Sequence, residues 1–380
     1  MRIELVALLI IGIFQSALLV FLLLAKKPKS VSDYILSGYL LISAITILFA
    51  YLEIWTRTNG YAFPWLLNLS TPLILLIGPS LWIYVKSLTT QSFRFKPIYL
   101  LLALPFVVVL LLLISANYIA PGDIKIEVDQ TESFRGDFVF FFIMGLIALS
   151  NVGYTLWGLL LIRGYRKRLR TYFSKTEHID LRWLRFLLIS AMVSYASISV
   201  LYIVDTVLEL MSYQELQLTG FGIASLFVLA VGFVGLKQGN IFTSVPKHFD
   251  MDKALNLTEK TLPITNQEEE FVHTLLRYMK DQKPHLNPEL TISRLSQELD
   301  CTPDYLSGVI NGRLNMNFFD FVNHHRIEEF KGLARDPKNK NLTLISLAYD
   351  SGFNSKATFN RVFKKEVGCT PSEYLGNISI

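Results

Sequence analysis

Residues 345–375 read ISLAYDSGFNSKATFNRVFKKEVGCTPSEYL, and this stretch decides the fold of the C-terminal part of the chain. Its apolar residues fall at helical spacing on two short segments, with Ile345, Leu347 and Ala348 on the first and Phe359, Val362 and Phe363 on the second. Gly352 marks a turn between them, Phe353 follows it as a core residue, and Ser355 is suited to cap the second helix. A helix, a tight turn with glycine and a second helix form the helix-turn-helix pattern.

A second copy of this pattern lies about fifty residues upstream, in residues 290–311. Leu295 and Leu299 face inward on its first helix, and Thr302 followed by Pro303 begins its second helix as an N-cap and first-turn pair. A longer amphipathic helix over residues 318–335 connects the two copies. One copy alone is a weak signal, but two copies joined by a helix are much more specific.

The second copy closely resembles the signature of the AraC/XylS transcription regulators. The matching residues are Ala348, Gly352, Phe353, Phe359, Phe363, Lys364, Gly368, Thr370, Pro371 and Tyr374, and Arg326 lies where the linker helix of that family carries an arginine. The resemblance covers residues 271–380. It implies two recognition helices that enter successive major-groove faces of one double-stranded promoter site, with no cofactor.

The candidate DNA contacts follow from the helical faces. Base-reading candidates are Lys356, Ala357, Asn360 and Arg361 on the second recognition helix and Ser307 and Asn311 on the first; candidates for backbone contacts are Ser355, Lys364, Lys365 and Arg313. Arginine pairs with guanine, asparagine with adenine, and an alanine methyl group meets thymine. The first copy has Ser296 and Asp300 where alanine and glycine are usual, so we expect the second recognition helix to read more of the sequence.

The rest of the chain has the composition of a membrane protein. Of its 380 residues only 18% are charged, and 52% are hydrophobic. Seven stretches are apolar over the length that crosses a bilayer, at about residues 4–25, 34–55, 64–85, 97–119, 138–162, 184–208 and 218–236. The fold class is therefore all-α, with a polytopic seven-helix transmembrane bundle before the DNA-binding domain. We expect domains at residues 1–237 and 271–380, joined by a cytoplasmic linker at 238–270.

Basic residues set the orientation of the bundle. The loops after the first, third and fifth stretches hold 14 Lys and Arg, whereas the opposite side holds four. Cytoplasmic loops carry the excess of Lys and Arg. The sequence thus predicts a multi-pass protein of the bacterial inner membrane, with the N-terminus outside and the C-terminal domain in the cytoplasm.

Two acidic residues near the outer ends of the spans, Glu53 and Asp205, are candidates for sensing a signal, because an ionisable group at membrane depth usually faces the bundle interior. The alternative is that both are solvated at the outer interface. Similarly, His324 and His325 on the linker helix are either a pH switch or, more simply, satisfied or solvated side chains.

These features favour a membrane-bound one-component transcription regulator that binds promoter DNA in response to a signal ligand, with a homodimer as a further expectation. The alternative is a membrane receptor or transporter whose soluble tail is regulatory. An enzyme is not expected, because the cytoplasmic part has no Gly-rich nucleotide loop and no nucleophile–base pair. The scattered histidines and the two cysteines, Cys301 and Cys369, give no metal-site spacing.

Overall fold

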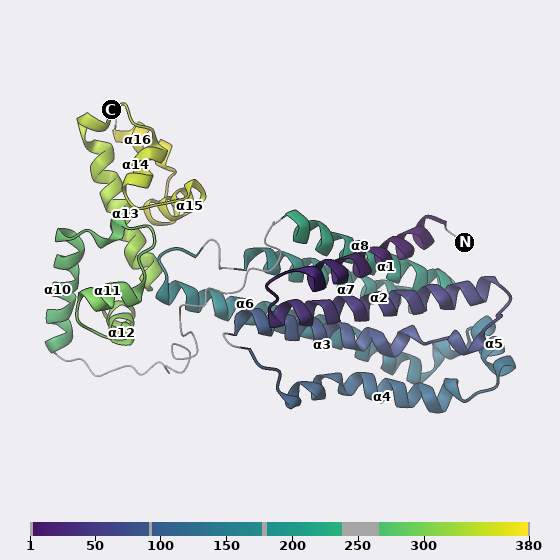
Figure 1. Cartoon of the computed structure of the whole chain (residues 1–380). Helices are drawn as coiled ribbons and strands as arrows, with labels where there is room; N and C mark the ends of the chain where they lie inside the picture. The colour runs from purple at the N-terminus through teal and green to yellow at the C-terminus, as the bar shows by residue number, and fades with distance from the viewer. Residues whose placement is uncertain (1–2, 91–92, 177–180, 238–265, 379–380) are drawn as a thin grey trace. The chain divides into compact units, whose positions relative to one another are not determined.

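The computed structural model describes residues 3–90, 93–176, 181–237 and 266–378, and within these ranges the chain is helical, without a strand (Figure 1). The described residues form two compact units. The first contains residues 3–163 and 181–237, and the second contains residues 164–176 and 266–378. Most of the predicted linker, residues 238–265, lies outside the described residues.

The first unit is a helical bundle. Its helices are α1 (Ile3–Ala25), α2 (Val31–Thr58), α3 (Ser70–Thr89), α4 (Leu104–Leu113), α5 (Gly122–Thr131), the first part of α6 (Phe138–Tyr172), α7 (Arg182–Leu208) and α8 (Tyr213–Lys237). Short 3-10 turns precede α3, α4 and α6, at Pro64–Leu66, Pro97–Ala103 and Ser133–Gly136. A capping box between Ser30 and Asp33 begins α2, and Lys26 pairs with the same carboxylate at 3.1 Å.

Six helices of the described chain are long and apolar enough to cross a membrane, and they correspond to six of the seven predicted stretches. The fourth predicted stretch differs, because its apolar helix covers only Pro97–Leu113. It continues as the π-helical segment Ile114–Tyr118, so the helical path still follows the predicted range. Pro97 and Pro105 begin the 3-10 and α-helical parts of this segment, where a missing backbone N–H costs little.

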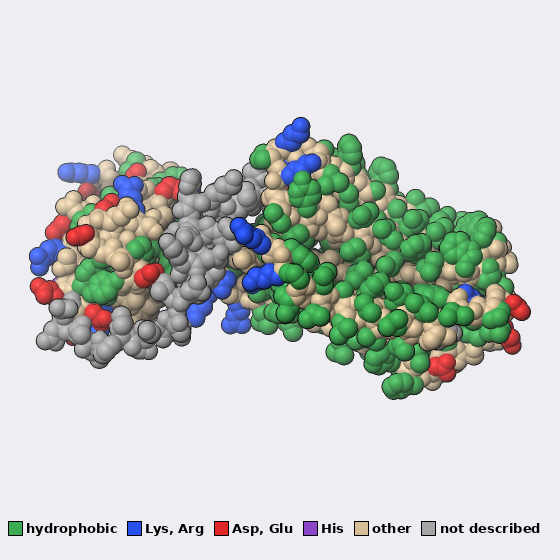
Figure 2. Space-filling model, turned by 60° about the horizontal axis from the view of Figure 1, so that its bottom comes forward, with side chains coloured by type: hydrophobic (Ala, Val, Ile, Leu, Met, Phe, Trp, Pro, Cys, Tyr) green, Lys and Arg blue, Asp and Glu red, His purple; other side chains and the backbone are tan. Residues whose placement is uncertain are grey.

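The surface of the first unit is strongly apolar. Figure 2 shows hydrophobic side chains covering the helices of this unit, with acidic side chains near one end. Phe14 and Phe21 on α1 are 67% and 68% exposed, and Leu149 on α6 is 75% exposed. An apolar surface of this kind is unfavourable in water and suits the hydrocarbon of a bilayer.

The second unit holds the predicted helix-turn-helix domain. Its helices are α10 (Asn266–Asp281), α11 (Ile292–Glu298), α12 (Pro303–Arg313), α13 (Phe318–Arg335), α14 (Leu344–Asp350), α15 (Lys356–Val367) and α16 (Pro371–Ile378). Helix α10 begins at Asn266, within the range that the sequence assigned to the linker, and includes the acidic run 268–270. Those carboxylates lie in the first turns of α10, where the positive end of the helix dipole stabilises their negative charge.

Candidate nucleic-acid interface

The second helix-turn-helix is built around a glycine turn. The N–H of Phe353 donates to the carbonyl of Ala348 at 3.0 Å, and Gly352 has a φ of +89°. A Cβ atom at Gly352 would lie 2.3 Å from the carbonyl oxygen of His285, so the turn needs glycine both for its backbone angle and for this close approach. The predicted core role of Phe353 is confirmed, since it packs with Phe359 in one buried aromatic cluster.

The first copy follows the same backbone path with different residues. The N–H of Cys301 donates to the carbonyl of Ser296 at 2.9 Å, which matches the bond in the second copy. Asp300 stands where the second copy has glycine and adopts a φ of +51°. A non-glycine residue in this region costs about 1–2 kcal/mol. Ser296 is buried, and its hydroxyl donates to the carbonyl of Ser293 at 2.9 Å, so the small polar residue fits the alanine position.

The recognition helix α15 separates an aromatic face from a polar face. Phe359, Val362 and Phe363 are buried against α13 and α14. The base-reading candidates Lys356, Ala357, Asn360 and Arg361 are all exposed. The guanidinium of Arg361 lies 5.9 Å from the ring centre of Phe319 on α13, so a cation–π contact holds the charged end of this side chain beside α13. The polar face thus presents one arginine, one asparagine, one lysine and a methyl group, the groups that read base edges.

Three candidates for backbone contacts also lie on α15 or at its start. The Ser355 hydroxyl accepts a hydrogen bond from the N–H of Thr358 and caps the helix, as predicted. Lys364 and Lys365 are exposed in the last turn, and Lys365 pairs with Asp320 at 3.0 Å. Because this ion pair is exposed, it is weak and leaves the ammonium group able to exchange partners.

The first recognition helix, α12, offers less than the sequence suggests. Ser307 is buried, and its hydroxyl and carbonyl oxygens accept hydrogen bonds from the amide of Asn311, at 3.2 and 2.9 Å. Arg313 donates two hydrogen bonds to the carboxylate of Glu268 on α10, with the closer nitrogen–oxygen distance 2.5 Å. Ser307 is therefore covered by its surroundings, its role as a base-reading candidate stays a prediction, and Arg313 is held by an acidic neighbour that the sequence places in the linker.

The family arginine Arg326 is a structural cation inside the domain. It is buried, and its guanidinium donates to the carbonyl oxygens of His285 at 2.8 Å and Asn287 at 2.9 Å. Burial lowers the pKa of Arg326 to about 10. Its hydrogen bonds fix the segment between α10 and α11 against α13, and they also reach the Ser174 hydroxyl at 3.4 Å.

The last motif residues begin helix α16 and connect it to α13. Thr370 and Glu373 make a capping box at the start of α16: the N–H of Thr370 donates to the carboxylate at 2.7 Å, and the N–H of Glu373 donates to the hydroxyl at 3.3 Å. The backbone hydrogen bond from Thr370 lowers the pKa of the exposed Glu373 carboxyl. Pro371 fits the first helical turn, and the Tyr374 hydroxyl accepts a hydrogen bond from Arg335 at 2.9 Å. Gly368 ends α15 with a φ of +86°.

The end of α6 belongs to the second unit. The Ser174 hydroxyl donates to the carbonyl of Leu290 at 2.6 Å, and Phe173 forms an isolated antiparallel bridge with Thr291, the N-cap of α11. The guanidinium of Arg170 lies 5.6 Å from the ring centre of Phe319. The sequence placed these residues in a cytoplasmic loop, and nothing in their pattern indicated that they join the second unit.

A pair of histidine rings lies inside the same domain. The rings of His285 and His325 are stacked 5.7 Å apart, and both nitrogens of His285 and Nε2 of His325 are buried without a hydrogen-bond partner in the described part of the chain. Burial lowers the pKa of each ring to about 4. The neighbouring His324 is shifted in the opposite direction, because a hydrogen bond with the Glu366 carboxylate raises its pKa. The alternatives for His325 therefore remain open, since the residue is half-buried and only its Nε2 atom lacks a partner among the described residues.

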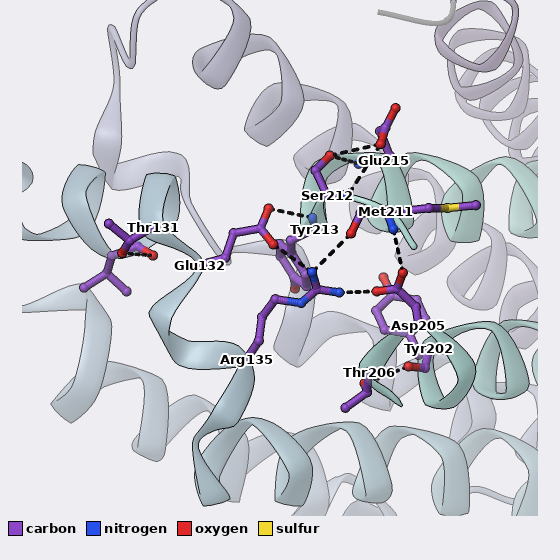
Figure 3. Close-up of polar contacts among 11 residues, drawn as sticks. Thr131, Glu132, Arg135, Tyr202, Asp205, Thr206, Met211, Ser212, Tyr213 and Glu215 are labelled. Atoms are coloured by element: carbon purple, nitrogen blue, oxygen red, sulfur yellow. Dashed lines mark hydrogen bonds and ion pairs between the residues drawn. The ribbon is translucent and has the colours of Figure 1, made fainter. Parts of the chain in front are cut away.

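The sensor candidates Glu53 and Asp205 are buried near the C-terminal ends of α2 and α7. Asp205 pairs with Arg135, which precedes α6 and also donates to Glu132 at 2.9 Å and to the carbonyl of Met211 at 3.1 Å (Figure 3). Glu132 in turn accepts from the N–H of Tyr213 at 2.7 Å. The cluster ties α5, α6, α7 and α8 together at one point.

Glu53 is part of a second cluster. Its carboxylate accepts from the N–H of Ser70 at 2.7 Å and from the amide of Gln217 at 2.5 Å. Gln217 accepts from Arg57 at 2.6 Å, and Arg57 makes two 2.8 Å hydrogen bonds to Asp129 on α5. The solvated alternative for Glu53 and Asp205 is wrong, since both are buried and paired. The sequence did contain a signal for the partners, because Arg57 and Arg135 are two of only four basic residues on the side that carries an acidic loop.

Comparison with known proteins agrees with this domain. Residues 295–377 match a family model described as a helix-turn-helix domain. An uncharacterized HTH-type transcriptional regulator of Staphylococcus aureus (strain COL) is 32% identical over 93 residues, 24% of this chain and 12% of the relative. The probable transcription factor PqrA of Proteus vulgaris is 24% identical over 109 residues, 29% of this chain and 86% of the relative. No solved structure gives a significant match.

The resemblance to AraC/XylS regulators is thus confirmed for the C-terminal domain, which is a DNA-binding helix-turn-helix module of the transcription-regulator type. The matched segment is about an eighth of the length of the staphylococcal relatives. These matches do not include the apolar helices of this chain.

Proposed function

We propose that this chain is a membrane-bound one-component transcription regulator of the bacterial inner membrane. Its first unit crosses the bilayer with the N-terminus outside, and its helix-turn-helix domain reads promoter DNA from the cytoplasm. The observation that carries the proposal is the exposed polar face of α15, with Lys356, Asn360 and Arg361, in one chain with six membrane-length helices. The distribution of basic residues supports the orientation.

The charge of the domain supports assistance from the membrane. Residues 271–380 carry 14 Lys and Arg against 12 Asp and Glu, so non-specific attraction to phosphate is weak. Two chains held in one membrane raise the local concentration of a second domain, and a homodimer would set the spacing of two half-sites. We therefore include a homodimer in the proposed assembly.

Arg361→Ala tests the function. In intact bacteria that carry the full chain, DNA cross-linking should recover fragments with a shared motif, and we expect the alanine variant to lose about 10- to 100-fold in occupancy and its preference at one base position. The reason is the loss of about 1–3 kcal/mol of base contact. Lys364→Ala is the control, since loss of a phosphate contact weakens all sites evenly. Equal motifs and occupancies in both variants would contradict the reading role of α15.

The end of α6 supports direct transmission of a signal. Helix α6 runs from Phe138 to Tyr172 without interruption, and its last turns belong to the unit that contains the helix-turn-helix domain. A movement of α6 in the first unit would therefore be passed on to that domain. Gly164 lies at the first position of the second unit, and a side chain there would meet only the end of Arg168, at 3.8 Å. We therefore propose that the first unit senses a signal and that α6 transmits it to Thr291 through the adjoining Phe173.

Gly164→Pro should change promoter occupancy in cells by at least about fivefold in either direction, because proline inside a helix breaks it at a cost of about 3 kcal/mol. Gly164→Ala is the matched control and should stay within about twofold of the parent, since alanine only favours the helix. The DNA motif should be the same in all three proteins. Occupancy in the proline variant that equals the parent's would show that α6 transmits nothing.

A further inference from the structure

A cavity lies inside the first unit, among α3, α6, α7 and α8. Its volume is about 360 Å³, which lies in the range of small-molecule sites. Most of its lining is apolar, for example Ile74, Met144, Ile198 and Phe221. At about 30 Å³ for each small group, it holds roughly a dozen non-hydrogen atoms.

The cavity also has a polar group without a partner. Ser70 and Asn151 both line it and are buried; the Ser70 hydroxyl lies beside the Glu53 carboxylate, whereas the Asn151 Oδ1 atom has no hydrogen-bond partner among the described residues. Unpaired buried polar atoms are costly, so a bound molecule that supplies a hydrogen bond is favoured. The two residues lie on different helices, α3 and α6, and leave apolar surface between them.

No charged side chain is among the described residues that line the cavity. The charges beside the lining already have partners: Glu53 and Arg57 are bound to the amide nitrogen and oxygen of Gln217, at 2.5 and 2.6 Å, and Asp205 pairs with Arg135. A charged ligand would therefore enter without a counter-ion, which is strongly unfavourable at this depth. The lining favours an uncharged molecule.

Access to the cavity comes from the outer surface of the helices. Phe141 on α6 and Ile203 and Val207 on α7 line it and are also 48%, 63% and 75% exposed on the apolar surface. In the proposed membrane topology this surface faces lipid. A ligand that is dissolved in the bilayer can then reach the cavity without crossing water.

We propose that this cavity binds an uncharged amphiphile drawn from the bilayer, with an aliphatic body of about ten carbons and one hydroxyl or similar hydrogen-bonding end. The proposal rests on the sensing role proposed above and names the class of its ligand. The hydrogen-bonding end meets Asn151, and the body lies along α6 and α7.

The cavity is connected to the buried clusters. Tyr213 lines it, donates its N–H to Glu132 at 2.7 Å and has its ring 5.7 Å from the Arg57 guanidinium (Figure 3). Tyr202 lines it as well and precedes Asp205 on α7 by one turn of helix. An occupant in the cavity therefore presses on the residues that join α7 and α8 to the rest of the bundle.

The test is photolabelling of the full chain in phosphatidylcholine nanodiscs by a diazirine analogue of 1-decanol. We expect labelled peptides from α6 and α7, competed by excess 1-decanol but at least about tenfold less by decane or decanoate, because the first lacks a hydrogen-bonding group and the second is charged. Labelling spread evenly over lipid-facing helices such as α1, or equal competition by decane, would overturn the proposal.

Two variants probe the cavity without disturbing its walls. A side chain at Gly145, which lines the cavity, meets nothing within 4 Å, and Gly153 on the same helix is equally open but faces away from the cavity. Gly145→Leu should lose most of the labelling, and Gly153→Leu should keep it. Asn151→Leu should weaken competition by 1-decanol about fivefold without lowering thermal stability, since its Oδ1 atom bonds nothing in the described chain.

The outcomes separate the site from the function. Specific labelling that leaves DNA occupancy unchanged by 1-decanol would confirm the site and overturn its sensing role. Absence of specific labelling in a chain that still binds its promoter motif would overturn the site and leave the regulator proposal standing. Labelling of Gly145→Leu equal to that of Gly153→Leu would place the ligand elsewhere.

Discussion

Gly352→Ala should unfold the second helix-turn-helix, with a loss of roughly 3 kcal/mol or more in the free energy of unfolding. The added Cβ would lie 2.3 Å from the carbonyl oxygen of His285 and 2.9 Å from the Cα of Leu286, both of which are backbone atoms. The φ of +89° adds about 1–2 kcal/mol of strain for any residue with a side chain. The segment that would have to move is held by Arg326, so the clash has no inexpensive relief.

Urea unfolding of the full chain in nanodiscs measures this loss. Cys301 and Cys369 are half-buried and both lie in the second unit, so pulses of 4,4′-dithiodipyridine report the unfolding of that unit alone. Asp300→Gly is the matched comparison in the first copy. It relieves a positive φ without adding an atom, and we expect it to stabilise by up to about 1 kcal/mol. A Gly352→Ala variant as stable as the parent would mean that the turn adapts.

The sequence was sufficient for the helix-turn-helix core because each of its positions has a local reason. Gly352, Phe353, Phe359 and Phe363 lie where helical spacing and turn chemistry require, and the structure buries them together. The apolar stretches could also be predicted, because a run of about 20 apolar residues is visible in the sequence itself. Only the fourth stretch is divided into 3-10, α and π segments, which its apolar composition does not reveal.

The contacts between distant residues could not be read from local pattern. Ser307 is a polar residue at the edge of the apolar face of α12, and the packing of this helix buries it. Arg57 and Asp129 are far apart in sequence and meet at 2.8 Å because α5 folds back over the end of α2. The joining of residues 164–176 to the DNA-binding unit is of the same kind. Such pairings depend on the tertiary fold, which periodicity does not specify.

Acid should destabilise the DNA-binding domain. The pKa of His285 and of His325 is about 4 in the folded chain, against about 6.5 when unfolded, so the unfolded state binds more protons between these values. Stability is therefore complete above about pH 6.5 and falls as the pH is lowered toward 4. At pH 5 each ring contributes a loss of about 2 kcal/mol, so the pair gives about 2–4 kcal/mol. His324 opposes this trend, since Glu366 raises its pKa.

His325→Phe separates the pair from other titrating groups. The ring lies against Phe321, with centroids 4.9 Å apart, so phenylalanine keeps the packing and removes one proton site. Urea unfolding followed by thiol pulses at pH 7 and pH 5 should show about half of the parent's loss of stability in this variant. Arg326 and Lys283 lower the pKa of His285 and Glu329 opposes them, and all three remain unchanged in the variant. His324→Gln is the control and should retain the full loss or increase it. A parent domain equally stable at both pH values would show that the buried rings are hydrated, because only solvation or a hydrogen-bond partner would return their pKa to the ordinary value.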